Sequence, residues 1–447
     1  MKKRSTTLKL VGLGLAGLGA AFSGAALAHV DQTVESKGGI SVFSKADNAY
    51  WFSLGGRLNL DEAIYSGGYQ DKGNNFASGG NIRRALLKFG GGLGDDFSYN
   101  MTLNFDGSTV KFNDVWLGAS AEMGGVIDRA SVRVGQFTPP TSLDDAPNYG
   151  TLDNNVFMES ALATSAFSTP SQVYGVQLGA SVLDSSMLSV AMYQPSKQET
   201  GNFGNTTHTD RLGGSVRATF VPVRADDTVL HLGAVGRYQS VNKNGAGNAA
   251  YSQTNLFSTA PEMQSRQVNG SVATGSTYNN LLLNTGSLRI ASYNVGTLEA
   301  LGIWGPISVE GEYYRTSVQR VPVVSVDKTA NNLRLGGGHL QAAYVLTGES
   351  RGYDFATGTL RNPKPADKCG AWEIAARYSF VNLNDQDVNG GSEHNATVGL
   401  NWFVNDNVRL AANYIRANIR PGTRTGITSV LPKRQLDIFG LRAAVTF

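Results

Sequence analysis

The chain has 447 residues, of which only 16% are charged, with 54 glycines and 13 prolines. The low charge content argues against a disordered polyelectrolyte, and the glycines show no three-residue period, which excludes a collagen-like chain. Length alone would suggest about two to four soluble domains, unless the chain forms one large closed barrel.

Residues 1–28 have the pattern of a secretory signal peptide. Lys2, Lys3 and Arg4 give a basic start, a small and apolar stretch follows, and Ala26 and Ala28 frame an A-x-A cleavage site. We therefore expect cleavage after Ala28. A retained membrane anchor is the alternative, but an apolar stretch of about 18 residues that is rich in Gly and Ala is less suited to it.

The chain that remains is nearly neutral. Four of the 38 Lys and Arg residues lie in the leader, which leaves 34 against 35 Asp and Glu. Without a basic excess, we expect no nucleic-acid partner. Residues 12–17 have the glycine spacing of a dinucleotide site but lie in the leader, so no cofactor is expected. The single Cys369 cannot form an intrachain disulfide, and we predict no metal site.

The rest of the chain repeats one unit, in which about ten alternating apolar and polar residues precede a Gly, Asn or Asp turn. From Phe97 to Phe105 every second residue is apolar, which places two sets on opposite faces of a strand. The expected strands have the length of a tilted bilayer crossing. Aromatic residues such as Trp51 and Trp402 recur near strand ends, and the last strand ends in Phe447, which we interpret as an outer-membrane insertion signal.

We therefore predict an all-β fold, a sixteen-stranded antiparallel transmembrane β-barrel with inward-folded loops. The strands are expected near residues 50–65, 81–92, 96–106, 111–121, 130–137, 173–183, 186–194, 210–221, 228–240, 287–300, 306–317, 333–346, 372–382, 394–404, 406–418 and 434–447. An even number puts both termini on the periplasmic side. Residues 29–49 are then a short periplasmic segment and residues 50–447 the barrel.

Short turns and long loops alternate between these strands, except that the long segment 347–371 lies on the short-turn side. A lumen of sixteen strands is open unless something narrows it. The loop 138–172 contains Phe157, Leu162 and Phe167 and is predicted to fold inward as a constriction. For the polar part of the loop 241–286, an inserted loop and a disordered external loop are equally compatible with the sequence.

Several segments resemble the phosphate-selective porin O and P family of Gram-negative outer membranes. They are LGGRL (54–58), IRRA (82–85), VGQF (134–137), VLTGESR (345–351), GAWE (370–373), ARYS (376–379), VGLNW (398–402) and the closing strand. The resemblance implies a trimer of sixteen-stranded barrels, each of which passes small anions along a ladder of arginines to a narrow site that contains lysine. It also implies a long periplasmic-side segment at 347–371.

With the apolar residues assigned to lipid, ten arginines are predicted to line the pore: Arg57, Arg84, Arg133, Arg211, Arg217, Arg237, Arg289, Arg377, Arg409 and Arg442. The acidic residues on the same face are Asp61, Asp96, Asp106, Asp114, Glu310, Glu312 and Glu373. Arginine suits phosphate oxygens, but any porin turns mid-strand arginines inward, because facing lipid costs about 2–4 kcal/mol. Of the adjacent pair we place Arg84 in the lumen, with Leu86 and Lys88, and Arg83 near an interface.

The predicted constriction loop has no basic residue. Its four acidic residues are Asp144, Asp145, Asp153 and Glu159. The lysines that the family uses at its narrowest point are therefore absent from this loop, and because selectivity depends on the groups lining that point, phosphate specificity is not expected. We predict a passive, water-filled porin for small ions and solutes with weak anion preference, a homotrimer surrounded by outer-membrane lipid and lipopolysaccharide.

Two other classes of function were weighed. A surface adhesin or antigen would act through the polar loops 194–210 and 241–286. An outer-membrane hydrolase would need a histidine base, and the histidines are His29, His208, His231, His339 and His394. His231 could meet Glu310 or Glu312 across the lumen, but the chain has no G-x-S-x-G or H-E-x-x-H motif, and we predict no catalytic residue.

Overall fold

The structure is a computed structural model, and it describes residues 32–36, 40–44, 50–67, 78–106, 110–145, 154–168, 172–183, 185–195, 212–241, 252–254, 256–263, 281–322, 331–422 and 434–447. The leader 1–28, Arg211, Asp153, His29 and His208 lie outside these ranges, as does most of both loops of the adhesin hypothesis. Within the described ranges, no helix has the length and apolar character needed to cross a bilayer.

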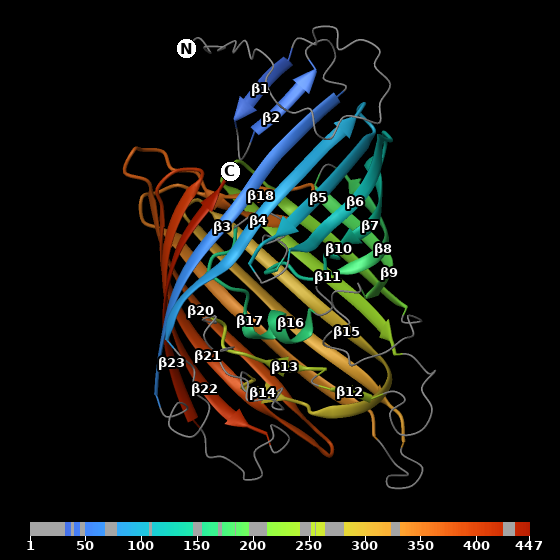
Figure 1. Ribbon diagram of the computed structural model, residues 1–447, viewed down its shortest axis with the longest axis vertical. Helices are drawn as coiled ribbons and strands as arrows, with labels where there is room; N and C mark the ends of the chain where they lie inside the picture. Colours follow the sequence, from blue (N-terminus) through green and yellow to red (C-terminus); the bar gives the residue numbers. More distant parts are fainter. Residues whose placement is uncertain are drawn as a thin grey trace.

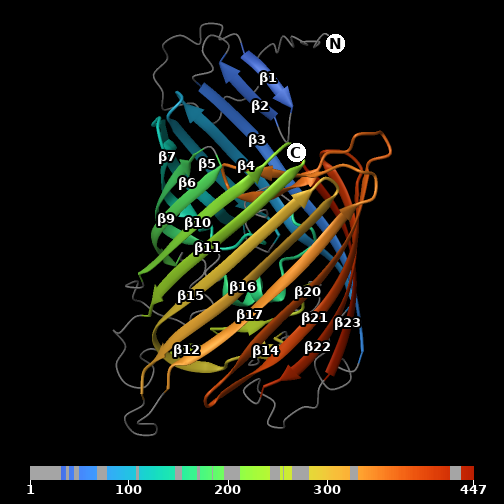
Figure 2. The same ribbon diagram turned by 180° about the vertical axis from the view of Figure 1, so that it is seen from behind.

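Sixteen antiparallel strands close into a barrel (Figures 1 and 2). They are β3 (Tyr50–Ser66), β4 (Gly79–Leu93), β5 (Phe97–Asn104), β6 (Lys111–Glu122), β7 (Ile127–Phe137), β8 (Val173–Val182), β9 (Ser186–Pro195), β10 (Gly213–Arg224), β11 (Thr228–Ser240), β15 (Ser287–Trp304), β16 (Ile307–Arg320), β17 (Leu333–Val345), β20 (Ala371–Asp385), β21 (Val388–Phe403), β22 (Val408–Pro421) and β23 (Arg434–Thr446). Each strand pairs with the next, and β23 pairs with β3, with Leu441 opposite Glu62. The predicted fold class is confirmed.

The two faces of each strand differ as the alternation predicted. In β10, Val216 and Phe220 are exposed on the outside of the barrel, whereas Ser215, Arg217 and Thr219 are buried in the lumen. An apolar outer face suits lipid and a polar inner face suits water. The sequence period therefore sets the inside and outside of the wall.

Among the register shifts of the described strands, two β-bulges change the position of predicted arginines. In the pairing of β3 with β4, Asn59 lies opposite Arg84 and Leu60 opposite Ile82, so Arg83 has no partner residue. An extra residue in one strand changes the face of the sheet toward which the neighbouring side chains point. Both Arg83 and Arg84 consequently reach the lumen, and the expected position of Arg83 at an interface is wrong.

The second bulge, in β15, lies between Ile290 and Ser292. On the N-terminal side of this bulge, Leu288 and Ile290 point into the hydrophobic core inside the barrel. Arg289 stands between them and so does not share their face. The structure therefore does not place Arg289 with the lumen arginines, contrary to the sequence-based assignment.

The connection between β20 and β21 is shorter than expected. The sequence predicted an external loop between residues 382 and 394, but both strands continue and meet at a tight turn of Gln386 and Asp387. Gln386 has φ of 52°, a left-handed conformation that two-residue hairpin turns use. This hairpin is one of the longest in the barrel wall.

A short hairpin precedes the barrel in the region predicted to be periplasmic. Its strands are β1 (Gln32–Ser36) and β2 (Ile40–Ser44), and β2 pairs with β3 through Ile40 opposite Leu54. Figure 1 shows this hairpin at the end of the barrel that also holds the C-terminus. The sheet thus continues beyond the barrel at this point.

The loop between β7 and β8 folds into the barrel, as predicted. It carries α1 (Leu162–Phe167), which Figure 1 shows inside the ring of strands. In the loop after β11, β12 (Ser252–Thr254) pairs with the start of β15 in the wall, whereas β13 (Ser258–Thr259) and β14 (Leu283–Asn284) pair with each other and fold inward. Phe167, Phe257 and Leu283 are buried together in one hydrophobic cluster. The core of this protein therefore lies in the lumen, between the loops and the wall.

Glycines on the inner face let the loops come close to the wall. A Cβ at Gly440 in β23 would lie 1.8 Å from Sδ of Met263, and one at Gly399 in β21 would lie 3.1 Å from the ring of Phe157. A side chain at Gly440 would therefore push the Met263 side chain aside.

The long segment between β17 and β20 enters the lumen from the opposite end to the loops. Its hairpin consists of β18 (Arg351–Asp354) and β19 (Thr359–Pro363). Leu360 is buried against Val221 and Leu301 of the wall. Two elements thus narrow the barrel, one from each end.

Candidate functional site

Glu312 in β16 fixes the start of the constriction loop to the wall. Its carboxylate accepts hydrogen bonds from the backbone N–H of Leu143 (2.7 Å) and Asp144 (3.1 Å) and from the hydroxyls of Ser142 and Tyr314, both at 2.9 Å. Three of these four donors belong to the loop. This predicted lumen carboxylate therefore holds the loop and does not face the pore.

Glu262, from the second inward loop, joins both loops to β20 of the wall. It accepts from the N–H of Leu162 at 3.0 Å, from Nη2 of Arg377 at 2.9 Å and from the hydroxyl of Ser379 at 2.8 Å. Arg377 also donates to the carbonyl of Glu159 at 3.0 Å. One ion pair thus ties two loops to β20.

Among the described carboxylates of the constriction loop, Glu159 lies close to the largest number of arginines. Arg83 donates to both its oxygens, at 2.9 and 2.7 Å, Arg442 is bonded to it as well, and Arg84 lies 3.7 Å away. Burial alone would raise the pKa of the Glu159 carboxyl, but the three arginines together hold this pKa well below its ordinary value. Glu159 is therefore ionised and its charge is compensated.

The backbone of the loop is held by further arginines. Arg409 donates to the carbonyls of Asn155 (2.7 Å) and Val156 (2.8 Å). Arg351, at the start of β18, donates to the carbonyl of Asn154 at 3.1 Å and forms a two-pronged ion pair with Glu373. Arg351 therefore links the constriction loop to the hairpin that enters from the other end.

The β18–β19 hairpin is bound to the wall in the same way. Arg217 donates to the carbonyls of Thr357 (3.0 Å) and Gly358 (2.9 Å) and to Glu299 at 2.9 Å. His231 lies between Glu299, at 3.2 Å, and the hydroxyl of Tyr353, at 2.6 Å. The partner of His231 is thus Glu299, not the Glu310 or Glu312 suggested by the sequence.

These contacts show what the ten predicted arginines touch. Six are buried and bonded to protein groups: Arg57, Arg217, Arg237, Arg377, Arg409 and Arg442. Arg84 lies beside Glu159, Arg133 faces an open cavity, Arg289 lies beyond a bulge, and Arg211 is outside the described residues. A buried arginine that already has protein acceptors is not available to a passing ion.

The acidic residues of the constriction loop are engaged as well. Asp144 is buried and accepts from the N–H of Ala161 at 2.6 Å. Asp145 is partly buried, and burial first, then the nearby Asp144, raises the pKa of its carboxyl to about 6. Glu159 is bonded to arginines, and Asp153 lies outside the described residues. The described acidic residues of the loop therefore present little negative charge to solvent.

An open cavity remains along the other half of the wall. It has a volume of about 470 Å³ and lies against β4 to β9, with the hairpin residues 356–359 on its other side. Its basic side chains are Lys88, Arg129 and Arg133, and its acidic side chain is Asp114. The guanidinium of Arg133 lies 4.2 Å above the ring of Trp116, which fixes its position.

The comparisons with known proteins agree with this architecture. The sequence profile of the family described as phosphate-selective porin O and P matches residues 52–445. The chain belongs to this family. Porin O of Pseudomonas aeruginosa is 25% identical over 403 residues, which cover 87% of each chain. The protein is thus an outer-membrane porin, a diffusion channel.

Two solved structures have the same fold as the porin. An anion-selective porin from Comamonas acidovorans has a TM-score of 0.52 at 12% identity, over 89% of this chain and 100% of that one. OmpT, an outer membrane protein of Vibrio cholerae, has a TM-score of 0.52 at 12% identity, over 91% of this chain and 99% of that one. At such identities the likeness concerns the barrel alone.

Sequence reasoning missed part of the basic lining of this porin. Lys88 was placed on the lumen face by alternation, but only arginines were counted as pore-lining. Arg129 was left out because the strand was expected to begin at residue 130, whereas β7 begins at Ile127. The available signal was the period of two, which puts Arg129 on the same face as Arg133 in one strand and Lys88 on the same face as Arg84 in another.

Proposed function

We propose that small anions cross this porin along the β4–β9 side of the lumen, with a weak preference over cations. The observation that carries the proposal is the distribution of charge over the cavity, with Lys88, Arg129 and Arg133 against Asp114. The guanidinium of Arg129 also lies 3.5 Å from the exposed carboxylate of Glu122, which reduces the contribution of Arg129 to the positive charge of the cavity. A modest positive excess at a narrow passage favours anions without excluding cations.

The proposed channel is a general anion path and does not bind phosphate specifically. Specific capture needs several donors around one dehydrated ion. In this chain the loop 138–172 contributes no Lys or Arg, and the buried arginines of the C-terminal wall donate to carboxylates and carbonyls of the protein. What remains at the cavity supports attraction of anions but not a tight phosphate site.

We further propose that the porin acts passively, without a catalytic residue. His231 has its two ring nitrogens directed at Tyr353 and Glu299, and no hydroxyl of a Ser or Thr among the described residues bonds to it. A nucleophile with its base is therefore not assembled at this histidine.

We propose a homotrimer in outer-membrane lipid and lipopolysaccharide, formed after cleavage of the leader near Ala28. OmpT of Vibrio cholerae, which has the same fold, has been solved in a trimer form, at 10% identity and a TM-score of 0.51. Chemical cross-linking of intact outer membranes tests the assembly, and N-terminal sequencing of the purified protein tests the cleavage site.

Reversal potentials in a salt gradient across planar bilayers test the anion path. The wild-type porin is expected to show stable ohmic conductance steps and a reversal potential on the anion-selective side. Lys88→Glu and Arg133→Glu should each move the reversal potential toward cation selectivity, because each replaces a positive by a negative charge at the cavity. Adding inorganic phosphate should leave the chloride current almost unchanged.

The matched control is Lys368→Glu, the same exchange at an exposed position of the 347–371 segment that does not line the cavity. If this control shifts the reversal potential as much as Lys88→Glu, the proposed path is wrong. If low concentrations of phosphate block the current, the path binds phosphate specifically and the general-anion proposal fails.

A further inference from the structure

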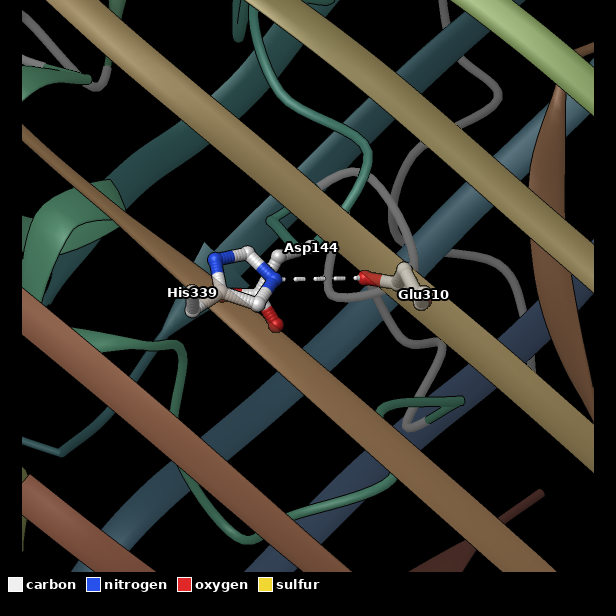
Figure 3. Close-up of side chains that lie close together, drawn as sticks. All are labelled: Asp144, Glu310 and His339. Carbon is white, nitrogen blue, oxygen red and sulfur yellow. Dashed lines mark ion pairs between the residues drawn. The ribbon is translucent and has the colours of Figure 1, made fainter.

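Three side chains from distant parts of the chain meet inside the barrel. They are Asp144 of the constriction loop, Glu310 in β16 and His339 in β17 (Figure 3). One ligand atom of each lies within 4.8 Å of the others. In Figure 3 the imidazole and the Glu310 carboxylate point toward one another, with Asp144 beside the ring.

The cluster is buried and incompletely bonded. Asp144 is 2% exposed, Glu310 3% and His339 5%. In the described part of the chain neither ring nitrogen of His339 has a hydrogen-bond partner, nor has Oε1 of Glu310. Leaving a buried polar atom unbonded costs about 1–3 kcal/mol, and a single bound cation would satisfy both Oε1 of Glu310 and the Nε2 of His339 that faces it.

The cluster also carries excess negative charge. Five other buried or nearly buried carboxylates of the lumen have an arginine partner: Asp61, Glu159, Glu262, Glu299 and Glu373. Within the described ranges, Asp144 and Glu310 form no ion pair with Lys or Arg. Buried charges need a counter-charge or a metal ion, and here only the imidazole is close.

We propose that Asp144, Glu310 and His339 bind a zinc ion. Imidazole nitrogens and carboxylate oxygens are zinc ligands, and a water would complete three protein ligands to the usual four. Two ligand atoms on one tetrahedral zinc are about 3.4 Å apart. Nε2 of His339 and Oε1 of Glu310 are 3.8 Å apart, so a shift of a few tenths of an ångström brings them to that separation.

The chemistry of the ligands selects the kind of cation. Calcium takes about six to eight oxygen ligands, and magnesium prefers oxygen ligands and keeps most of its water. A site with an imidazole and two carboxylates instead suits a divalent transition metal, for which zinc is the probe of choice. The ion would join the constriction loop to two neighbouring strands, so it would set the position of the loop without standing in the proposed anion path.

Metal analysis of the purified porin tests the site. The detergent-solubilised protein is stripped with a chelator and titrated with zinc chloride, and bound zinc is measured by mass spectrometry. One zinc per chain is expected in the wild type. His339→Gln and Glu310→Gln should each lower the affinity by about tenfold or more, since even supporting residues around a metal contribute this much. His394→Gln, an exposed histidine near Tyr378, is the matched control and should bind as the wild type does.

Two further measurements keep the outcome decisive. The heat-dependent gel mobility of each variant shows whether the barrel is folded, and anomalous scattering at the zinc edge locates the ion in crystals of the wild type. Equal zinc binding by folded His339→Gln and wild type, no stoichiometric binding by the wild type, or zinc located elsewhere would each overturn the proposal. None of these results depends on whether the channel prefers anions.

Discussion

Arg442 shows how a lumen arginine is engaged by the protein itself. Its Nε and Nη2 donate to the two oxygens of Asp61, each at 2.7 Å, and it is also bonded to the carbonyl of Met158 and the carboxylate of Glu159. The guanidinium therefore joins β23, β3 and the constriction loop. At this position the sequence predicted the direction of the side chain but not its partners.

Replacing Arg442 should destabilise the folded barrel. Arg442→Gln leaves Asp61 buried without its cation, and breaking one side of a buried ion pair costs about 3–5 kcal/mol. Denaturant titration of the porin refolded in detergent or lipid measures the free energy of unfolding.

Arg361→Gln is the control for this experiment. Its ion pair with Asp354 is partly exposed, and exposed pairs contribute about 0–1 kcal/mol. A similar loss for both variants would show that Arg442 does not hold the loop as described.

The two elements that narrow the barrel are held by the same kinds of contact. Arginines bind both of them, and each buries apolar side chains: Phe167 in the constriction loop and Leu360, which is 1% exposed, in the β18–β19 hairpin. The hairpin contributes residues 356–359 to the wall of the open cavity. Its position should therefore affect the width of the channel.

Leu360→Asp should move the hairpin away from the wall and increase the single-channel conductance. A carboxylate at this position would be buried among apolar side chains without a partner, which strongly disfavours the docked position. Single-channel recording in planar bilayers measures the change. Ala366→Asp introduces the same group at an exposed position of the same segment and should leave conductance unaltered. Equal conductance of both variants would contradict a role for the hairpin in the constriction.

The sequence predicted the strands well because a single period of two governs each of them. The ends of β8 and β9, for example, fall within one residue of the expected ranges. Bulges interrupt that period by one residue and leave no compositional signal, which is why Arg83 and Arg289 were misplaced. The contacts of Glu262 with Arg377 and Leu162 join residues 100 or more apart, and no local pattern contains that information.

The barrel closes where its first strand, β3, pairs with its last strand, β23. Phe447 exchanges backbone hydrogen bonds with Gly56, at 2.7 and 3.0 Å. Its ring lies over Gly56, where a Cβ would come within 2.3 Å of it. The last residue thus completes the pairing of β23 with β3.

Deleting Phe447 should lower the yield of closed barrel in the outer membrane. The deletion removes two hydrogen bonds of the seam and the aromatic residue that we interpret as the insertion signal. The fraction with heat-dependent gel mobility in isolated outer membranes measures assembly. Phe447→Tyr keeps the backbone and the ring and should assemble normally. Full assembly of the deletion would show that neither the seam contacts nor the terminal ring is required.

The inward-folded loops and the open cavity lie mainly against different parts of the barrel wall. Most anchors of the loops lie on β15 to β23, with others on β3, β4 and β11, whereas the cavity lies against β4 to β9. A substitution between residues 80 and 190 on the cavity face can consequently alter which solutes pass while the interior packing stays intact. The residues that line the passage and those that hold the interior together therefore overlap only in part.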